Sequence, residues 1–267
     1  MDYLERRVAM VDDRLVEVVE AVEPGELSRQ LRHVALSGGK RVRPAVTILA
    51  CEAVGGDPED AVDFAVSVEL VHNASLVVDD IIDRSDVRRG NQSAWAAFGY
   101  GPAIVASDGL LGEAFALLSI DERATRIVAE AMVELGEGEA TELVARPTTE
   151  REYMELARRK TGALFRAAAE LGAVAGGADP LAVEAFGDYV LDATADAADL
   201  GKPTGQDAEM DRPSLVQVTA LSPEEANARA REQADLALDA LETADLDDTE
   251  ALSYLRDLAE FVVVRER

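Results

Sequence analysis

Residues 62–83 read VDFAVSVELVHNASLVVDDIID. Within this stretch, apolar side chains recur at steps of three and four residues, the spacing of one face of an α-helix: Val62, Val66, Leu70, Ala74 and Val77. The same spacing runs through residues 4–22 near the start of the chain. The alternation of apolar and polar residues that is typical of half-buried strands is nearly absent. The sequence therefore predicts an all-α protein.

Capping residues and short glycine breaks indicate where the helices begin and end. Asp57-Pro58 and Asp179-Pro180 each place an aspartate at a helix cap and a proline in the first turn. Thr149 and Glu152 form a capping-box pattern. No Pro- or Ser-rich linker and no internal repeat divides the chain, so we expect one helical domain over residues 1–267. The expected helices cover residues 2–22, 26–36, 44–54, 59–84, 102–119, 121–144, 150–174, 181–199, 223–243 and 249–264.

The composition argues against nucleic acid as a partner. The 267 residues include 53 Asp and Glu against 26 Lys and Arg, a formal charge of −27 that would repel a phosphate backbone. The single cysteine, Cys51, cannot form an internal disulfide, which favours a reducing compartment. No signal peptide and no run of about 18 uncharged apolar residues is visible. We therefore expect a cytoplasmic protein without a membrane span.

Lysine is nearly absent from the chain. Of the 26 Lys and Arg residues, only Lys40, Lys160 and Lys202 are lysines, and the acidic residues are spread over the whole sequence. In 1 M salt the Debye length is about 3 Å, so a surface covered with carboxylates repels itself little. This pattern favours a protein from a salt-loving organism, and an acidic adaptor domain is the alternative.

Three aspartates, Asp79, Asp80 and Asp83, end the apolar stretch quoted above. On a helix, Asp79 and Asp83 share one face, with Asp80 beside them. Oxygen ligands of this kind suit Mg²⁺, which is usually held by one or two carboxylates together with substrate phosphates. Because one residue in five is acidic, a chance cluster is the alternative, as at residues 245–248.

Several Lys and Arg residues stand next to glycines in the sequence. Residues 37–44 read SGGKRVRP, a turn with three cations just before an expected helix, and Arg88-Arg89-Gly90 follows the aspartates. Lys160 and Lys202 each stand within two residues of a glycine. Such cations on flexible turns would bind phosphate, although leftover surface residues would give the same pattern.

Together these motifs resemble the trans-type isoprenyl diphosphate synthases, also called polyprenyl synthetases, in a halophilic archaeal form. The matching segments follow the family order and span most of the chain. They are residues 38–44 (GGKRVRP), 69–83, 86–90 (DVRRG), 160–162 (KTG) and 201–207 (GKPTGQD).

The resemblance implies an antiparallel helical bundle of the isoprenoid synthase type around a central cavity. It implies a Mg²⁺-dependent transferase that ionises an allylic diphosphate and joins it to isopentenyl diphosphate. The family is normally homodimeric, and a heteromer with another synthase subunit is the alternative. An apolar, water-poor cavity suits this chemistry because the allylic cation must be kept from water.

The resemblance also assigns roles residue by residue. Asp79 and Asp83 would bind Mg²⁺ with support from Asp80. The allylic diphosphate would be held by Arg88, Lys160 and Lys202, with Thr161 lining the pocket. Isopentenyl diphosphate would be held by Lys40, Arg43, His72 and Arg89. His72 alone would more often be an ordinary half-buried histidine.

The second aspartate motif of the family is degenerate here. It reads Asp188-Tyr189-Val190-Leu191-Asp192, with tyrosine in place of the middle aspartate. Asp188 and Asp192 keep the i, i+4 spacing of a weakened metal site, whereas a solvated acid is the alternative for Asp188. The segments before Lys160 and after it both look short for the family. A catalytically weak or inactive subunit that binds diphosphates or pairs with an active synthase is therefore the second hypothesis.

Small residues precede the first aspartate motif. Ala74 and Ser75 stand five and four positions before Asp79, where the family uses a bulky aromatic residue to stop short products. Neither side chain can block a growing prenyl tail, so we expect a product of C20 or longer.

Overall fold

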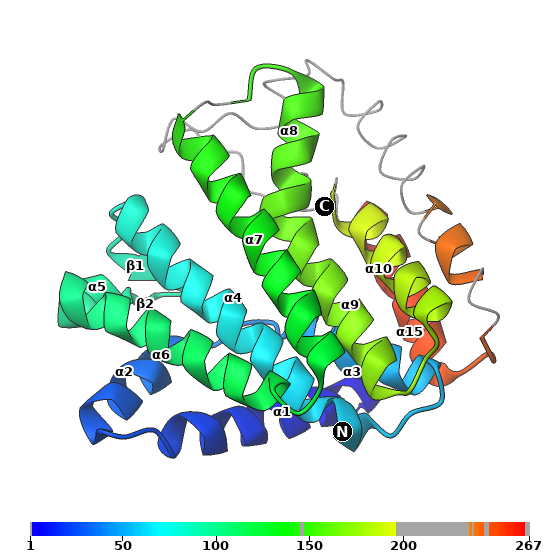
Figure 1. Ribbon diagram of the computed structural model, residues 1–267, viewed down its shortest axis with the longest axis horizontal. Coiled ribbons are helices and arrows are strands. Elements are labelled where there is room, and N and C mark those ends of the chain that lie inside the picture. The colour runs from blue at the N-terminus through cyan, green and yellow to red at the C-terminus, as the bar shows by residue number, and fades with distance from the viewer. Residues whose placement is uncertain (1, 145–146, 196–234, 237, 243–245, 265–267) are drawn as a thin grey trace.

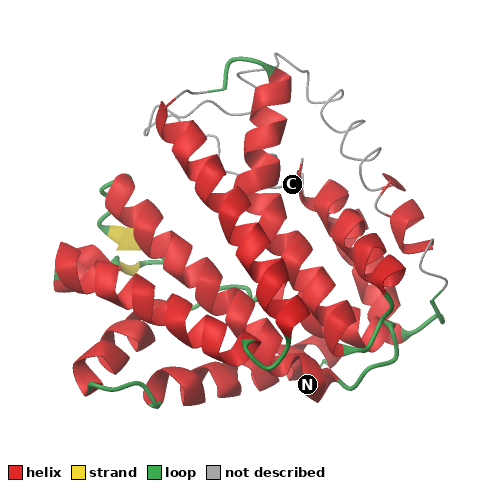
Figure 2. Cartoon of the chain, in the orientation of Figure 1, coloured by secondary structure: helices red, strands yellow, loops and turns green. Residues whose placement is uncertain are grey.

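The computed structural model describes residues 2–144, 147–195, 235–236, 238–242 and 246–264. These residues form a bundle of helices with one short two-stranded hairpin (Figures 1 and 2). The all-α prediction is confirmed. The first elements are α1 (Tyr3–Glu20), α2 (Gly25–Ala35), α3 (Val42–Ala53), η1 (Pro58–Ala61), α4 (Val62–Ile82), β1 (Val87–Arg88), β2 (Asn91–Gln92) and α5 (Ala94–Phe98). They are followed by α6 (Tyr100–Leu118), α7 (Glu122–Val144), α8 (Glu150–Ala157), η2 (Arg158–Gly162), α9 (Ala163–Ala175), α10 (Pro180–Ala195) and α15 (Glu250–Val264).

Helix α4 is the centre of the bundle. It packs against α6, α3, α9 and α1, and most of its length between Phe64 and Val77 is buried. In Figure 1, α4 and α6 run side by side, and α7 lies alongside α9. The central position explains the sequence of α4, which is apolar around most of its circumference rather than along one stripe.

Helices α3 and α9 approach each other closely at Gly172. A Cβ atom at this position would lie 2.1 Å from the backbone oxygen of Thr47, so only glycine fits. This contact holds α9 against α3, which begins directly after the 37–41 turn.

The capping predictions are confirmed where the structure describes them. Thr149 accepts a hydrogen bond from the backbone N–H of Glu152, whose side chain returns to the Thr149 backbone. Asp57 and Asp179 accept hydrogen bonds from the N–H groups of Glu59 and Ala182. Each satisfies a backbone donor that a helix start leaves unpaired.

The segment between α4 and α6 differs from the prediction, because it holds a hairpin and a short helix. Strands β1 and β2 pair antiparallel, and Trp95 of α5 donates a hydrogen bond to the Ser85 carbonyl at 2.9 Å. The hairpin has no alternating pattern because each strand is only two residues long. It fixes Arg88 and Arg89 beside α4.

Two expected helices are interrupted. The 59–84 segment begins with the separate turn η1, and the 150–174 segment contains the π-turn η2. Most of the expected 223–243 helix lies outside the described residues.

Among the described residues, two helical segments are long and apolar enough to cross a membrane. The first, Pro58–Ile82, is mostly buried inside the bundle, as the core helix of a soluble protein would be. The second, α6, has only a third of its most apolar window buried. It leaves Tyr100, Ile104 and Val105 exposed.

Candidate active site

A cavity of about 250 Å³ lies between α4, α6 and α7. Its lining is apolar apart from two serines and two acids, Asp79 and Glu139. Along α4 the lining runs from Val71 to Asp79, a rise of about 12 Å at 1.5 Å per residue. Ala74 and Ser75 both line the cavity, as the sequence predicted.

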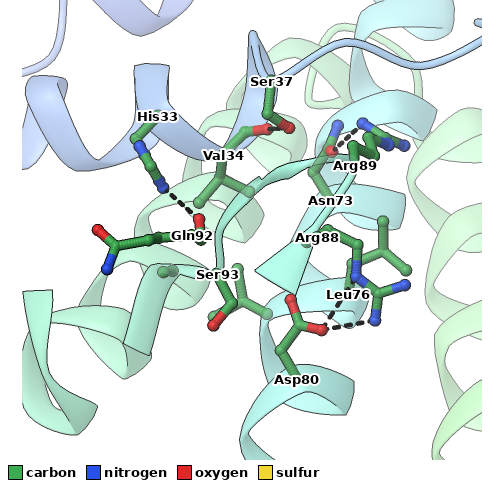
Figure 3. Close-up of a pocket in the computed structure, with 12 residues that line it drawn as sticks. His33, Val34, Ser37, Asn73, Leu76, Asp80, Arg88, Arg89, Gln92 and Ser93 are labelled. Carbon is green, nitrogen blue, oxygen red and sulfur yellow. Dashed lines mark hydrogen bonds and ion pairs between the residues drawn. The ribbon is translucent and has the colours of Figure 1, made fainter. Parts of the chain in front are cut away.

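Helix α4 presents a second stripe to a different pocket. Asn73, Leu76, Val77 and Asp80 line a small hollow between α4, α2 and the hairpin (Figure 3). Successive residues of a helix point about 100° apart. The neighbouring Asp79 and Asp80 therefore serve separate environments.

Asp79 is half-buried in an acidic neighbourhood. Its pKa is raised to about 7, mainly by burial and also by Glu139 and Asp83, while Lys160 opposes the shift. Oxygen donors that repel one another in this way fit a divalent cation such as Mg²⁺.

Asp80 is occupied by Arg88. Its side chain is buried, and one oxygen accepts hydrogen bonds from Arg88 Nε at 2.9 Å and Nη2 at 2.6 Å (Figure 3). Burial raises the pKa of Asp80, and Arg88 opposes that shift. The geometry makes Asp80 a partner of Arg88.

Ion pairs from Arg158, Arg159 and Lys160 hold η2 against α7. Lys160 Nζ lies 2.7 Å from Glu139 Oε1 and also forms an ion pair with Glu142. Arg158 and Arg159 pair with Glu134 and Glu137 of α7. Burial works against the charge on Lys160, but hydrogen bonds to the two glutamates outweigh it and raise its pKa.

The π-turn and a glycine make this arrangement possible. A Cβ atom on Gly138 would lie 2.9 Å from Lys160 Cγ, so a side chain there would push η2 away from α7. Single turns of π-helix, such as η2, are rare and frequently occur at functional sites. Thr161 lies half-buried in the same turn.

Glu139 and Glu142 were missed by the sequence analysis. They are three residues apart on α7, which places them on one helix face. That spacing is a weak signal in a chain this rich in acids. The sequence feature that could have pointed to them is Gly138, one of two glycines in α7. A glycine within a helix indicates a close approach by another element.

Arginines gather around His72. Burial lowers its pKa, and Arg43, Arg89 and Arg88 lower it further. Arg43 lies with its guanidinium carbon 4.2 Å from the centre of the Phe165 ring. Burial lowers the pKa of Arg43 to about 10, and its Nε is buried with no hydrogen-bond partner. A buried donor without an acceptor is costly, so this cluster suits an anion. Lys40, three residues before Arg43, is exposed.

The second acidic pair has different surroundings. Asp188 is exposed and helps to raise the pKa of Glu170 on α9. Tyr189 is buried, and its hydroxyl donates a hydrogen bond to the Leu255 carbonyl of α15. The side chain of Asp192 and the whole of Lys202 lie outside the described residues.

In the described part of the chain, no three His, Cys, Asp or Glu side chains converge on a point that could hold a metal ion. Asp79 and Asp83 would need phosphate oxygens and water to complete a coordination shell. That is the usual form of a Mg²⁺ site at a phosphate.

A helical bundle around an apolar cavity that is acidic at one end is the architecture of the isoprenoid synthase class of fold. The structure is similar to that of geranylgeranyl pyrophosphate synthetase from the archaeon Geoglobus acetivorans. The TM-score is 0.88 with 30% identity, covering 100% of both chains.

The sequence comparisons agree. The chain is 35% identical to a short chain isoprenyl diphosphate synthase of Methanothermobacter thermautotrophicus, over 87% of this chain and 78% of the relative. It is 36% identical to a geranylgeranyl diphosphate synthase of Methanosarcina mazei, over 82% and 75%. The polyprenyl synthetase family model matches residues 24–254. The chain belongs to the polyprenyl synthetase family.

One comparison bears on the shortened segments. The match to the Geoglobus sequence runs over 318 aligned positions, more than the 267 residues of this chain. The relative therefore has residues that this chain lacks, and shortening on both sides of Lys160 stays a prediction.

Proposed function

We propose that this protein is a prenyltransferase that condenses isopentenyl diphosphate with an allylic diphosphate. The product is an isoprenyl diphosphate of C20 or longer. The observation that carries this conclusion is the cavity between α4, α6 and α7, with acids and Lys160 at one end and apolar walls beyond. Two relatives named as geranylgeranyl diphosphate synthases support the product class.

The allylic diphosphate belongs at the acidic end of the cavity. Asp79 and Asp83 would hold Mg²⁺, which neutralises the departing diphosphate when bound. By the family resemblance, Arg88, Lys160 and Lys202 would supply positive charge to the same group, and in this structure Arg88 is paired with Asp80 beside the hairpin. Glu139 and Glu142 keep the Lys160 ammonium charged and in place.

Isopentenyl diphosphate belongs in the cluster of Lys40, Arg43, His72 and Arg89. The support is the unpaired, buried Nε of Arg43, together with the four arginines that lower the pKa of His72. His72 stays neutral in this surrounding and can donate one hydrogen bond to a phosphate oxygen.

The cavity walls set the length of the product. Small side chains at Ala74 and Ser75 leave the path along α4 open, and Leu111 and Met132 also line the cavity. Apolar walls also keep water from the allylic cation.

A weak or inactive subunit is the second candidate. Tyr189 favours it, because a core tyrosine replaces the middle acid of the second motif. With that acid absent, Asp188 and Asp192 would form at most a weak metal site.

One assay separates the two candidates. Purified protein is incubated with Mg²⁺, isopentenyl diphosphate and a C5, C10 or C15 allylic diphosphate, and the extracted products are sized. A prenyltransferase gives products of C20 or longer, and the absence of product with every primer would leave the subunit hypothesis.

The assembly we propose is a homodimer of single-domain chains in the cytoplasm. The exposed Tyr100, Ile104 and Val105 of α6 support it, since a second copy would cover them. Light scattering after size exclusion tests the mass, and a monomer at micromolar concentration contradicts the proposal. A heteromer would require a second synthase subunit to bind the same face.

The charge of −27 supports a halophilic origin. The Debye length grows from about 3 Å at 1 M salt to about 30 Å at 0.01 M, so self-repulsion should loosen the fold at low salt. Circular dichroism measures this, and an unchanged helical signal would count against adaptation to salt.

A further inference from the structure

We propose that Glu69 and Asn73 of α4 are positioning residues that act with Arg41 to fix Arg89 and the 38–40 turn. None of the three is assigned to a substrate. The inference rests on the proposed function, because it takes the Arg43 and Arg89 cluster as the isopentenyl diphosphate site.

The argument begins at Arg41, which adopts a left-handed backbone conformation with φ of 51°. A residue other than glycine holds this conformation only where its surroundings enforce it. The side chain is buried and has partners on three helices. They are Asp12 of α1 at 2.8 Å, the Ala35 carbonyl of α2 at 3.0 Å and Glu69 of α4 at 2.5 Å.

Pinning Arg41 sets the directions of its neighbours. Lys40 precedes it, and Arg43 follows two residues later in the first turn of α3. Lys40 and Arg43 therefore take their positions from a side chain that cannot itself reach a substrate.

Glu69 is the buried anion of this group. Only 3% of its side chain is exposed, against 47% for Asp12. Its Oε1 accepts hydrogen bonds from Arg41 and from Asn73 Nδ2, the latter at 3.2 Å. A buried carboxylate persists only when it is paired in this way.

Asn73 connects Glu69 to Arg89 through hydrogen bonds. Its Nδ2 donates to the side chain of Glu69 and also to the Glu69 carbonyl at 2.7 Å. Both amide hydrogens are then used, and Oδ1 faces Arg89 Nη1 at 3.5 Å (Figure 3). The orientation of this amide is thus set by Glu69.

Arg89 closes the path back to the turn. It has a φ of 52°, and its Nη1 donates a hydrogen bond to the Gly38 carbonyl. The guanidinium lies 3.0 Å from the place where a Cβ atom on Gly39 would stand, so a side chain there would displace it. One chain of contacts therefore runs from Arg41 through Glu69 and Asn73 to Arg89 and returns to Gly38.

The path leaves the acidic end of the cavity untouched. Glu69 precedes Asp79 by ten residues, about 15 Å along the helix, and neither Glu69 nor Asn73 lines the cavity. A positioning role consequently predicts an effect on isopentenyl diphosphate and none on the allylic diphosphate. A purely structural role predicts equal effects on both.

The test measures binding by calorimetry on the full chain, so turnover is not needed. Isopentenyl diphosphate and geranyl diphosphate with Mg²⁺ are titrated separately. For Glu69→Gln we expect about a tenfold weaker Kd for isopentenyl diphosphate and an unchanged Kd for geranyl diphosphate.

The matched control is Glu52→Gln. Glu52 is a largely buried glutamate, with 12% of its side chain exposed, that pairs with Arg7 through two hydrogen bonds. Its loss should leave both Kd values unchanged. Equal weakening by the two variants, or equal weakening for the two ligands, would overturn the inference.

A double-mutant cycle gives an independent test if Glu69→Gln fails to fold. Asn73→Ala should weaken isopentenyl diphosphate binding about threefold in the wild type and have no effect when Arg89 is already alanine. Additive effects would show that Asn73 does not act through Arg89.

The wild-type protein separates this inference from the proposed function. Binding of isopentenyl diphosphate without product formation would refute the catalysis and leave the positioning role intact. No binding of isopentenyl diphosphate would refute both.

Discussion

Two acidic pairs in this chain have the same i, i+4 spacing, Asp79 with Asp83 on α4 and Asp188 with Asp192 on α10. In each pair the residue after the first acid is buried. On α4 it is Asp80, which binds Arg88, and on α10 it is Tyr189, which binds a backbone carbonyl. Asp79, the first acid of the α4 pair, is half-buried near Glu139 and Asp83, whereas Asp188 is exposed.

The comparison shows that helical spacing does not by itself make a metal site. Asp79 gains its chemistry from Glu139 of α7 and from Lys160 of η2, which pairs with Glu139. Asp188 has the same spacing and acts on Glu170 of α9, but its own side chain is exposed. The inward-facing second position accepts either a paired carboxylate or a tyrosine, since both satisfy their polar groups in the core.

Removing the first acid of each pair should give the largest contrast. We expect Asp79→Ala to lower turnover at least about 100-fold, the loss typical of removing one stabiliser of developing charge. Asp188→Ala should lower it less than about tenfold. Steady-state product formation measures both, with Asp247→Ala in an acidic surface loop as the control. Similar losses for Asp79 and Asp188 would mean that the two pairs are equivalent.

Restoring the missing acid should harm the fold. Tyr189→Asp would place a carboxylate without a partner in the core, at a cost of about 3 kcal/mol or more in the free energy of unfolding. Tyr189→Phe removes only one hydrogen bond and should cost about 1 kcal/mol. Urea denaturation measures both. If Tyr189→Asp is as stable as the wild type and more active, position 189 belongs to the metal site.

Filling the cavity should change product length. Ala74→Phe places a ring in the lining of α4 and should shorten the product by at least one C5 unit. Leu76→Phe is the control, because Leu76 lies on the stripe that faces the small pocket. Chromatography of the extracted products checks the lengths, and an unchanged length for Ala74→Phe would place the stop elsewhere.

The smallest effect concerns pH. The pKa of Asp79 is raised from 3.8 to about 7 in the folded protein, so the folded state binds more protons than the unfolded state between those values. Stability contributed by the protonated form is therefore lost as the pH rises toward 7. Without Mg²⁺, the difference in Tm between Asp79→Asn and the wild type should grow from pH 5 to pH 8. A constant difference would show that Asp79 titrates normally.

Local patterns predicted much of this molecule. The period of residues 62–77, the acids that follow and the caps at Asp57 and Thr149 depend on neighbours within a few residues, and the structure confirms the helices and caps. The same holds for Ala74 and Ser75, whose positions follow from helical spacing to Asp79.

Long-range contacts explain what the sequence did not predict. Glu139 and Glu142 become part of the site only because Gly138 lets η2 approach α7. Each strand of the hairpin is only two residues long, which is too short to show a periodic pattern. The separation of Asp79 from Asp80 depends on which helices cover α4, and spacing along one helix cannot supply that information.

The two stripes of α4 also have an evolutionary consequence. Asp79 faces the cavity and Asp80 faces the hairpin, on one rigid helix. Any rotation of α4 that drew one aspartate toward its partners would carry the other away from its own. Backbone movement therefore cannot improve both environments at once, and adaptation of this family member to new substrates must proceed by exchanging side chains around a helix that stays where it is.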